Sequence, residues 1–181
     1  MALPKSNRQL VLRPQDLVVL LRLSLVKDAP PTYAVLASEL SLTASEVHAG
    51  VERATVAQLA RKEESGKPFA VREALRLFVQ QGARYAFPAV RGEAARGMPT
   101  GYAASPLREK IAQSNDPIPV WPFKNGTARG VALYPLYPTV PEAASRNSKL
   151  YELLVLFDAI RGGSARERAL AITLLDERLK E

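Results

Sequence analysis

Apolar residues recur at three- and four-residue intervals through the first third of the chain, which is the spacing of an amphipathic helix. The first such stretch begins at Pro14, a residue favoured just inside a helix start because its missing N–H has no partner there. Its apolar stripe includes Leu17, Leu20 and Leu21. Two consecutive prolines at 30–31 end the pattern, since the residue before a proline is displaced from the helical region. We therefore expect one helix that starts at Pro14 and ends before these prolines.

Two shorter helical patterns follow, and a turn at 41–42 separates them. The second of them starts with Thr43 and Glu46, which have the spacing of a capping box. In such a box a hydroxyl and a carboxylate satisfy the free N–H groups at the start of a helix. The pattern therefore predicts a helix–turn–helix unit over residues 32–54, with Val47 and Val51 on the buried side of its second helix.

Helical spacing returns twice more along the chain. It predicts a helix over 72–81, with Gly82 as its stop and a brief extended segment over 84–88. The last part of the chain, 148–181, is rich in Leu, Ala and charged residues and contains no proline. A second capping-box pattern at 164–167 divides this part. It is therefore predicted to form a helical hairpin.

Prolines dominate the region between these helices. Nine of the 14 prolines lie between residues 88 and 141, and a proline interrupts helices and the interiors of sheets. The Asn-Gly pair at 125–126 favours a tight turn. We expect an irregular, partly extended region with one hairpin, whose strands lie at 122–123 and 129–133.

Composition narrows the chemistry that the chain can perform. With 47% apolar residues the chain can bury a core, and the absence of Cys excludes disulfides, thiolate zinc sites and cysteine nucleophiles. His48 is the only histidine, so a His-rich metal site or a Ser-His-Asp triad is hard to build. The glycines fit neither a P-loop nor a dinucleotide fingerprint. The sequence therefore predicts no enzyme activity and no cofactor.

The N-terminal part shows no pattern that directs the chain to a membrane. Its most apolar stretch, 17–25, is interrupted by Arg22 and Ser24, and a bilayer span needs about 20 apolar residues. No small-residue cleavage site follows the stretch. We expect a cytoplasmic protein without a membrane partner.

Positive charge indicates an anionic partner. The chain has 25 Lys and Arg against 18 Asp and Glu, a net charge of +7. Residues 1–100 hold 14 of these cations and nine of the acids, so +5 of the excess lies there. Nucleic acid is the commonest partner of such a basic chain.

The stretch YAVLASELSLTASEVH, residues 33–48, carries a family resemblance. It combines an apolar helix with the small Ala37 midway, Leu42 in the turn, and a capped second helix. In this order it resembles the helix-turn-helix of bacterial winged-helix transcription regulators of the MarR and Lrp type. The turn position that such proteins often fill with glycine is Ser41 here. The resemblance implies binding of double-stranded DNA.

Motifs outside this stretch are similar to those of a family of small bacterial regulators. They are GARYAFPA at 82–89, RGMPT at 96–100, PVWP at 119–122, RG at 129–130 and LYPL at 133–136. This resemblance covers most of the chain and also implies DNA binding.

Pattern and resemblance together predict a mainly α fold with three parts. These are a winged helix-turn-helix DNA-binding domain over 1–87, a Pro-rich, irregular, partly extended segment over 88–147 and a C-terminal helical hairpin over 148–181. We expect the hairpin to form a homodimer or partner interface, because many helix-turn-helix regulators read paired half-sites as dimers.

The resemblance also assigns the residues expected to contact DNA. The second helix of such a unit lies in the major groove with its first turn nearest the base edges. The exposed positions carried over are Thr43, Ala44, Ser45, His48, Ala49 and Glu52, with Arg53 as the first cation of this helix. Ser45 and His48 can hydrogen-bond to bases, whereas Ala44 or Ala49 can only touch a thymine methyl group.

Two lysines complete the expected interface. The wing is expected around 63–69, where Gly66 permits a tight turn. Lys62 and Lys67 flank this turn and are the expected phosphate contacts. For His48 and for each lysine the alternative is an ordinary surface residue.

The leading hypothesis is a sequence-specific transcription regulator that acts as a repressor. The alternative is an antitoxin-like interaction protein that neutralises a toxin enzyme encoded beside it and represses its own operon. The Pro-rich segment would then offer Trp121, Tyr134 and Tyr137 as anchors for the partner. The alternative is that these aromatic residues cover a small core.

Overall fold

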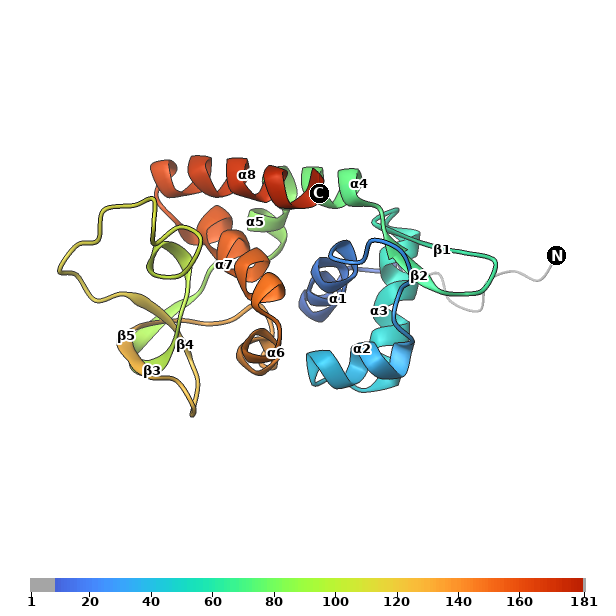
Figure 1. Cartoon of the computed structure of the whole chain (residues 1–181), viewed down its shortest axis with the longest axis horizontal. Helices are drawn as coiled ribbons and strands as arrows, with labels where there is room; N and C mark the ends of the chain where they lie inside the picture. Colours follow the sequence, from blue (N-terminus) through green and yellow to red (C-terminus); the bar gives the residue numbers. More distant parts are fainter. Residues whose placement is uncertain (1–8, 181) are drawn as a thin grey trace.

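The computed structural model describes residues 9–180, whose elements form two halves that meet along one seam (Figure 1). The N-terminal half holds three helices and a two-stranded antiparallel hairpin. These elements are α1 (Pro14–Ser24), α2 (Tyr33–Leu40), α3 (Ala44–Val56), β1 (Ala60–Lys62) and β2 (Pro68–Ala70). The predicted helix starts at Pro14 and after Thr43 are confirmed.

A continuous helical segment leads out of this half. It consists of α4 (Arg72–Leu77), a π-helical turn (Phe78–Gly82) and α5 (Ala83–Ala86). The predicted stop at Gly82 and the extended segment after it are wrong. The helix instead continues through the π turn, which contains Gly82, into α5.

The C-terminal half contains a small sheet that closes on itself. Its strands are β3 (Arg91–Pro99), β4 (Pro119–Pro122) and β5 (Ala128–Leu133), and a 3₁₀ turn (Gly101–Ala103) follows β3. β3 pairs antiparallel with both of the other strands, which pair with each other in parallel.

The predicted hairpin at the Asn-Gly pair is wrong in its pairing. A turn does lie there, with the N–H of Gly126 donating to the carbonyl of Phe123 at 3.0 Å. However, β4 pairs with residues 97–99 of β3, and β5 pairs with residues 91–97 of the same strand. Both strands run antiparallel to β3 and therefore in the same direction as each other. Gly97 makes this possible: a Cβ there would lie 1.8 Å from the carbonyl oxygen of Trp121.

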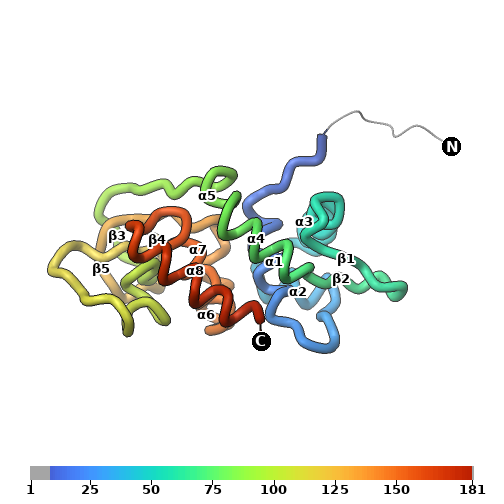
Figure 2. Tube along the Cα trace, turned by 90° about the horizontal axis from the view of Figure 1, so that it is seen from above, coloured from blue at the N-terminus to red at the C-terminus, as the bar shows by residue number. Residues whose placement is uncertain are grey.

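Three helices complete the C-terminal half: α6 (Val140–Arg146), α7 (Ser148–Gly162) and α8 (Ala165–Lys180). The predicted hairpin of α7 and α8 is confirmed, including its capping pair, in which the N–H of Glu167 donates to Ser164 at 3.3 Å. Helix α6 was not predicted, because it lies in the proline-rich stretch and has Pro141 in its own first turn. Seen from above, α8 runs across α7 toward the N-terminal half (Figure 2).

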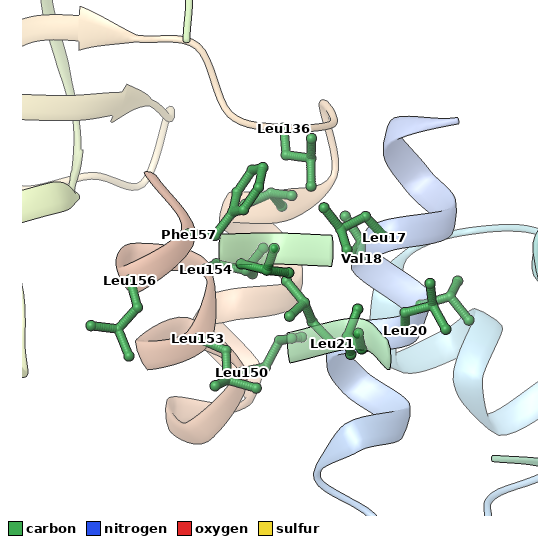
Figure 3. Packing of buried hydrophobic residues seen from close by; sticks show 14 of the residues in the cluster. Leu17, Val18, Leu20, Leu21, Leu136, Leu150, Leu153, Leu154, Leu156 and Phe157 are labelled. Atoms are coloured by element: carbon green, nitrogen blue, oxygen red, sulfur yellow. The ribbon is translucent and has the colours of Figure 1, made fainter. Parts of the chain in front are cut away.

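The core of the molecule lies at the seam between α1 and α7 (Figure 3). Leu17 and Leu21 of α1 face Leu150 and Leu154 of α7, and each of the four residues is at most 1% exposed. Helix α7 is buried on nearly all sides, since residues 153–161 have little contact with solvent. The two halves therefore share one hydrophobic core.

A buried polar cluster joins α7 to the small sheet. Asp158 and Arg161 form an ion pair at 2.8 Å, with side chains only 2% and 4% exposed. The same carboxylate accepts hydrogen bonds from the indole N–H of Trp121 at 2.6 Å and the hydroxyl of Thr100 at 2.7 Å. Arg161 also donates to the carbonyl of Tyr134 at 2.8 Å. The cluster thus ties α7 to three other segments of the C-terminal half.

The predicted fold class, a mainly α winged helix-turn-helix protein, is wrong. Of the described residues 51% are helical and 15% lie in strands, so the fold is mixed α/β. The segment expected to be irregular, 88–147, contributes a closed sheet and a helix to a core that it shares with the first half. Helices α2 and α3 and the β1–β2 hairpin therefore belong to a larger mixed α/β fold, which local sequence patterns do not predict.

Candidate nucleic-acid interface

The turn between α2 and α3 sets the start of α3. Ser41 adopts a left-handed backbone conformation with φ of 53°, a region that glycine enters most readily. Thr43 and Glu46 then form the predicted capping box. The N–H of Glu46 donates to the Thr43 hydroxyl at 3.1 Å, and the N–H of Thr43 donates to the Glu46 carboxylate at 2.8 Å. The first turn of α3 is therefore well anchored.

The capping box makes the helix start sensitive to acid. The hydrogen bonds from Thr43 hold the pKa of Glu46 below its ordinary value of 4.5. The pKa of Glu46 is lower in the folded state than in the unfolded state. The stabilisation that the capping box provides is therefore present at neutral pH and is lost as the pH falls through the folded-state pKa.

Glu46→Gln should therefore weaken the dependence of stability on pH below about 4.5 while leaving neutral-pH stability within about 1 kcal/mol of the wild type. Chemical unfolding at pH 7 and at pH 3.5 measures both values. An unchanged pH dependence in the variant would contradict the assignment, and Glu109→Gln, on an exposed turn, is the matched control.

One side of α3 is buried and the other faces solvent. Val47 and Val51 are completely buried, as predicted. Thr43, Ala44 and Ser45 are exposed, and the His48 side chain is 58% exposed. Ala49 is half-buried beside them. The structure thus brings the predicted base-contacting residues onto one solvent-facing surface.

His48 and Glu52 belong to a cluster that links three elements. The His48 ring lies 5.2 Å from the Tyr33 ring of α2, and its Nε2 is 3.6 Å from the Glu52 carboxylate. Glu52 also pairs with Lys62 of β1, which lowers the pKa of Glu52 and raises that of Lys62. The Tyr33 hydroxyl donates to the carbonyl of Gly66 at 3.4 Å. Glu52 and Lys62 therefore neutralise each other and position α3 against the hairpin.

Arg53 lies on the buried side of the helix. Its guanidinium donates two hydrogen bonds of 2.7 Å to Asp16 of α1, whose side chain is completely buried. These bonds raise the pKa of Arg53. Gly50 makes room for the pair, since a Cβ there would lie 2.8 Å from an Asp16 oxygen. Arg53 therefore positions α3 on α1, and we leave it out of the proposed interface.

The β1–β2 hairpin carries two exposed cations besides Lys62. Gly66 closes its turn with φ of 77° and donates its N–H to the carbonyl of Glu63 at 2.8 Å. Lys67 is exposed beside this turn. Arg61 is also exposed and lies with its guanidinium 5.1 Å from the Phe69 ring centre, its cross-strand neighbour. The site assignment from sequence did not include Arg61. Neighbouring residues of a strand point to opposite faces, and Lys62 faces Glu52 of α3. Arg61 therefore lies on the other face of β1, where it lines a hollow beside Lys27 and Arg72.

The C-terminal half contacts the turn from outside. The Tyr137 hydroxyl donates to the Glu46 carboxylate at 3.3 Å, and Arg146 of α6 donates to the carbonyl of Ser38 at 2.9 Å and to the hydroxyl of Ser41 at 3.0 Å. Helix α6 therefore borders the exposed surface of α3 at the α2–α3 turn. No sequence pattern indicated these contacts, because they join residues 91 to 108 positions apart.

The described residues contain neither a cluster suited to a metal ion nor a helix suited to spanning a membrane. Within 9–180, no group of three or more His, Asp or Glu side chains is arranged to hold a metal ion. In the same part of the chain, every helix is too short or too polar to cross a membrane.

Comparison of the chain with models of known protein families, with curated proteins and with solved structures finds no match.

Proposed function

We propose that the protein binds double-stranded DNA through the exposed side of α3 and the β1–β2 hairpin, and that it regulates transcription as a repressor. The observation that carries the proposal is the solvent-facing first turn of α3, with Ser45 and His48 on a helix whose opposite side is fixed by Asp16 and Arg53. A helix held in this way can enter the major groove without rearrangement of its own core.

The polar residues on the exposed side of α3 are expected to contact the bases. The Ser45 hydroxyl both donates and accepts hydrogen bonds, and the His48 imidazole can contact a purine N7 or a phosphate. Ala44 and Ala49 provide small apolar surface suited to a thymine methyl group. With no guanidinium on this surface, the most common contact to guanine is lacking, so we expect a preference for A·T pairs.

Phosphate contacts fall to Arg61 and Lys67. Both are exposed on the β1–β2 hairpin, Lys67 beside its turn and Arg61 on the face away from α3, whereas the charge of Lys62 is offset by Glu52. The exposed Glu63 and Glu64 at the tip of the hairpin restrict the contact to these two cations. Electrostatic binding of this kind is modest for one chain, and a homodimer on paired half-sites would double it. Formation of that homodimer, like the alternative toxin-binding role, stays a prediction.

Salt dependence tests the proposal. Two phosphate contacts predict that the logarithm of the association constant falls with log[salt] at a slope of about −2 per chain. Fluorescence anisotropy with labelled duplex DNA from upstream of the gene, at salt concentrations from about 50 to 200 mM, measures this slope.

Lys67→Ala should reduce the slope by about one, whereas Lys124→Ala should leave it unchanged. Lys124 is equally exposed but lies in the turn between β4 and β5, at the opposite end of the molecule (Figure 1). The proposal fails if the duplex is not bound at the lowest salt, or if both variants lose the same amount.

A further inference from the structure

A second charged surface lies at the seam between the two halves, away from the exposed side of α3. A cavity of about 240 Å³ opens there. Lys27, just beyond α1, and Arg72, at the start of α4, line it from one half. Lys149 and Glu152 of α7 and Arg178 of α8 line it from the other. The cavity thus draws its walls from four separate helical regions.

The lining carries an excess of positive charge. Four cations face one carboxylate, which leaves a formal charge of +3. Glu152 is already engaged, because Arg178 donates to it at 2.7 Å. Arg72 donates one N–H to the carbonyl of Val26 at 2.7 Å, which fixes its guanidinium at the wall. Lys27 and Lys149 are exposed, and within residues 9–180 neither ammonium forms an ion pair or a side-chain hydrogen bond.

Such an arrangement attracts anions, since the fields of neighbouring cations in a hollow add to one another. It suits a ligand with at least two negative charges. Guanidinium groups match the oxygens of a phosphate in a fork geometry, and lysines add point charges around it. Leu153 gives the cavity an apolar wall, so that a small carbon skeleton can be accommodated as well.

The size of the cavity limits the ligand. Pockets for drug-sized molecules run from about 300 Å³ upward, so 240 Å³ suits a smaller molecule and excludes a DNA duplex. We infer that this cavity binds a small phosphorylated metabolite, a phosphate monoester or a diphosphate. Bound there, the ligand bridges Lys27 and Arg72 of one half with Lys149 and Arg178 of the other. This inference does not depend on DNA binding.

Calorimetric titration with inorganic pyrophosphate, at low ionic strength and without DNA, tests the inference on the full chain. Thermal unfolding with and without the same probe gives a second readout, because a ligand that binds only the folded protein raises the melting temperature. Inorganic phosphate and citrate are titrated in parallel. The order pyrophosphate, then phosphate, then citrate is expected, and citrate binding most tightly would overturn the assignment to phosphorylated ligands.

Variants locate the binding. Lys27→Ala and Lys149→Ala should each weaken pyrophosphate binding about tenfold, since each removes one charge-assisted contact. Glu152→Gln should tighten it, because it removes the only carboxylate of the lining. Lys67→Ala is the matched control: its lysine is equally exposed but belongs to the proposed DNA surface, and it should bind pyrophosphate like the wild type.

The outcomes separate the two proposals. Absence of binding and of any rise in melting temperature at millimolar pyrophosphate overturns the cavity assignment and leaves DNA binding untouched. Equal losses in Lys67→Ala and in the two cavity variants overturn it too, because they indicate a general attraction of anions. Loss in the cavity variants alone, with a gain in Glu152→Gln, supports it whether or not the protein binds DNA.

Discussion

Replacing Asp158 by alanine is expected to lower the free energy of unfolding by about 3–5 kcal/mol. The substitution leaves the guanidinium of Arg161 buried without its partner, and it removes the acceptor for the indole of Trp121 and the hydroxyl of Thr100. A buried charge that loses its partner is one of the most destabilising changes in a protein. Its effect should reach α7 and the small sheet together.

Urea unfolding monitored by tryptophan fluorescence measures this loss directly. Trp121 is the only tryptophan of the chain, and its indole lies in the cluster itself. Asp116→Ala is the matched control, because that carboxylate is exposed, and it should change stability by less than about 0.5 kcal/mol. If Asp158→Ala were as mild as the control, the buried ion pair would not hold the C-terminal half together.

The second large effect is expected from Asp16→Ala. We expect the free energy of unfolding to fall by about 3 kcal/mol, at the lower end of the range for buried pairs. The loss is limited because the side chain of the partner, Arg53, is 13% exposed and can still reach water. The variant also removes the acceptor for the N–H of Arg13 at the start of α1. Because the pair fixes α3 on α1, the affinity for DNA should fall as well.

A double-mutant cycle separates the pair from its surroundings. Asp16→Ala and Arg53→Ala should each be costly, and the double variant should lose less than the sum of the two. Additive losses, measured by urea unfolding of all four proteins, would show that the two side chains do not stabilise each other in solution.

Local rules are sufficient for the first three helices of the chain. Pro14 starts α1, and Thr43 with Glu46 starts α3, because each acts on backbone groups within its own turn. The turn at 41–42 lies where the sequence predicts it, although the left-handed backbone of Ser41 is visible only in the structure. These features depend on neighbours in the sequence, so they can be predicted from it.

The closed sheet and the connecting helix depend instead on distant neighbours. Gly97 is required by the approach of the Trp121 backbone, 24 residues away along the numbering, and nothing next to Gly97 indicates it. Likewise Gly82 ends no helix, because it lies within a π turn and the next residue, Ala83, packs in the core as part of α5. This long-range pairing makes the fold mixed α/β, whereas the proline content of 88–147 predicted an irregular segment there.

For the candidate interface, the sequence indicated which side of α3 is exposed but not which charges are free. Periodicity placed Val47 inward and Ser45 outward. It could not show that Arg53 pairs with Asp16, 37 positions away, or that Lys62 pairs with Glu52. Tertiary ion pairs therefore changed the set of expected phosphate contacts to Arg61 and Lys67.

The most direct test of the central claim compares one variant on two DNAs. Ser45→Ala combined with His48→Ala removes the polar groups of the α3 surface while keeping its fold, since both side chains are exposed. Its affinity for the upstream duplex should fall about tenfold or more, corresponding to 1–3 kcal/mol for a lost base contact, while its affinity for a shuffled duplex of the same length should hardly change. Equal losses on both duplexes would contradict base recognition by α3.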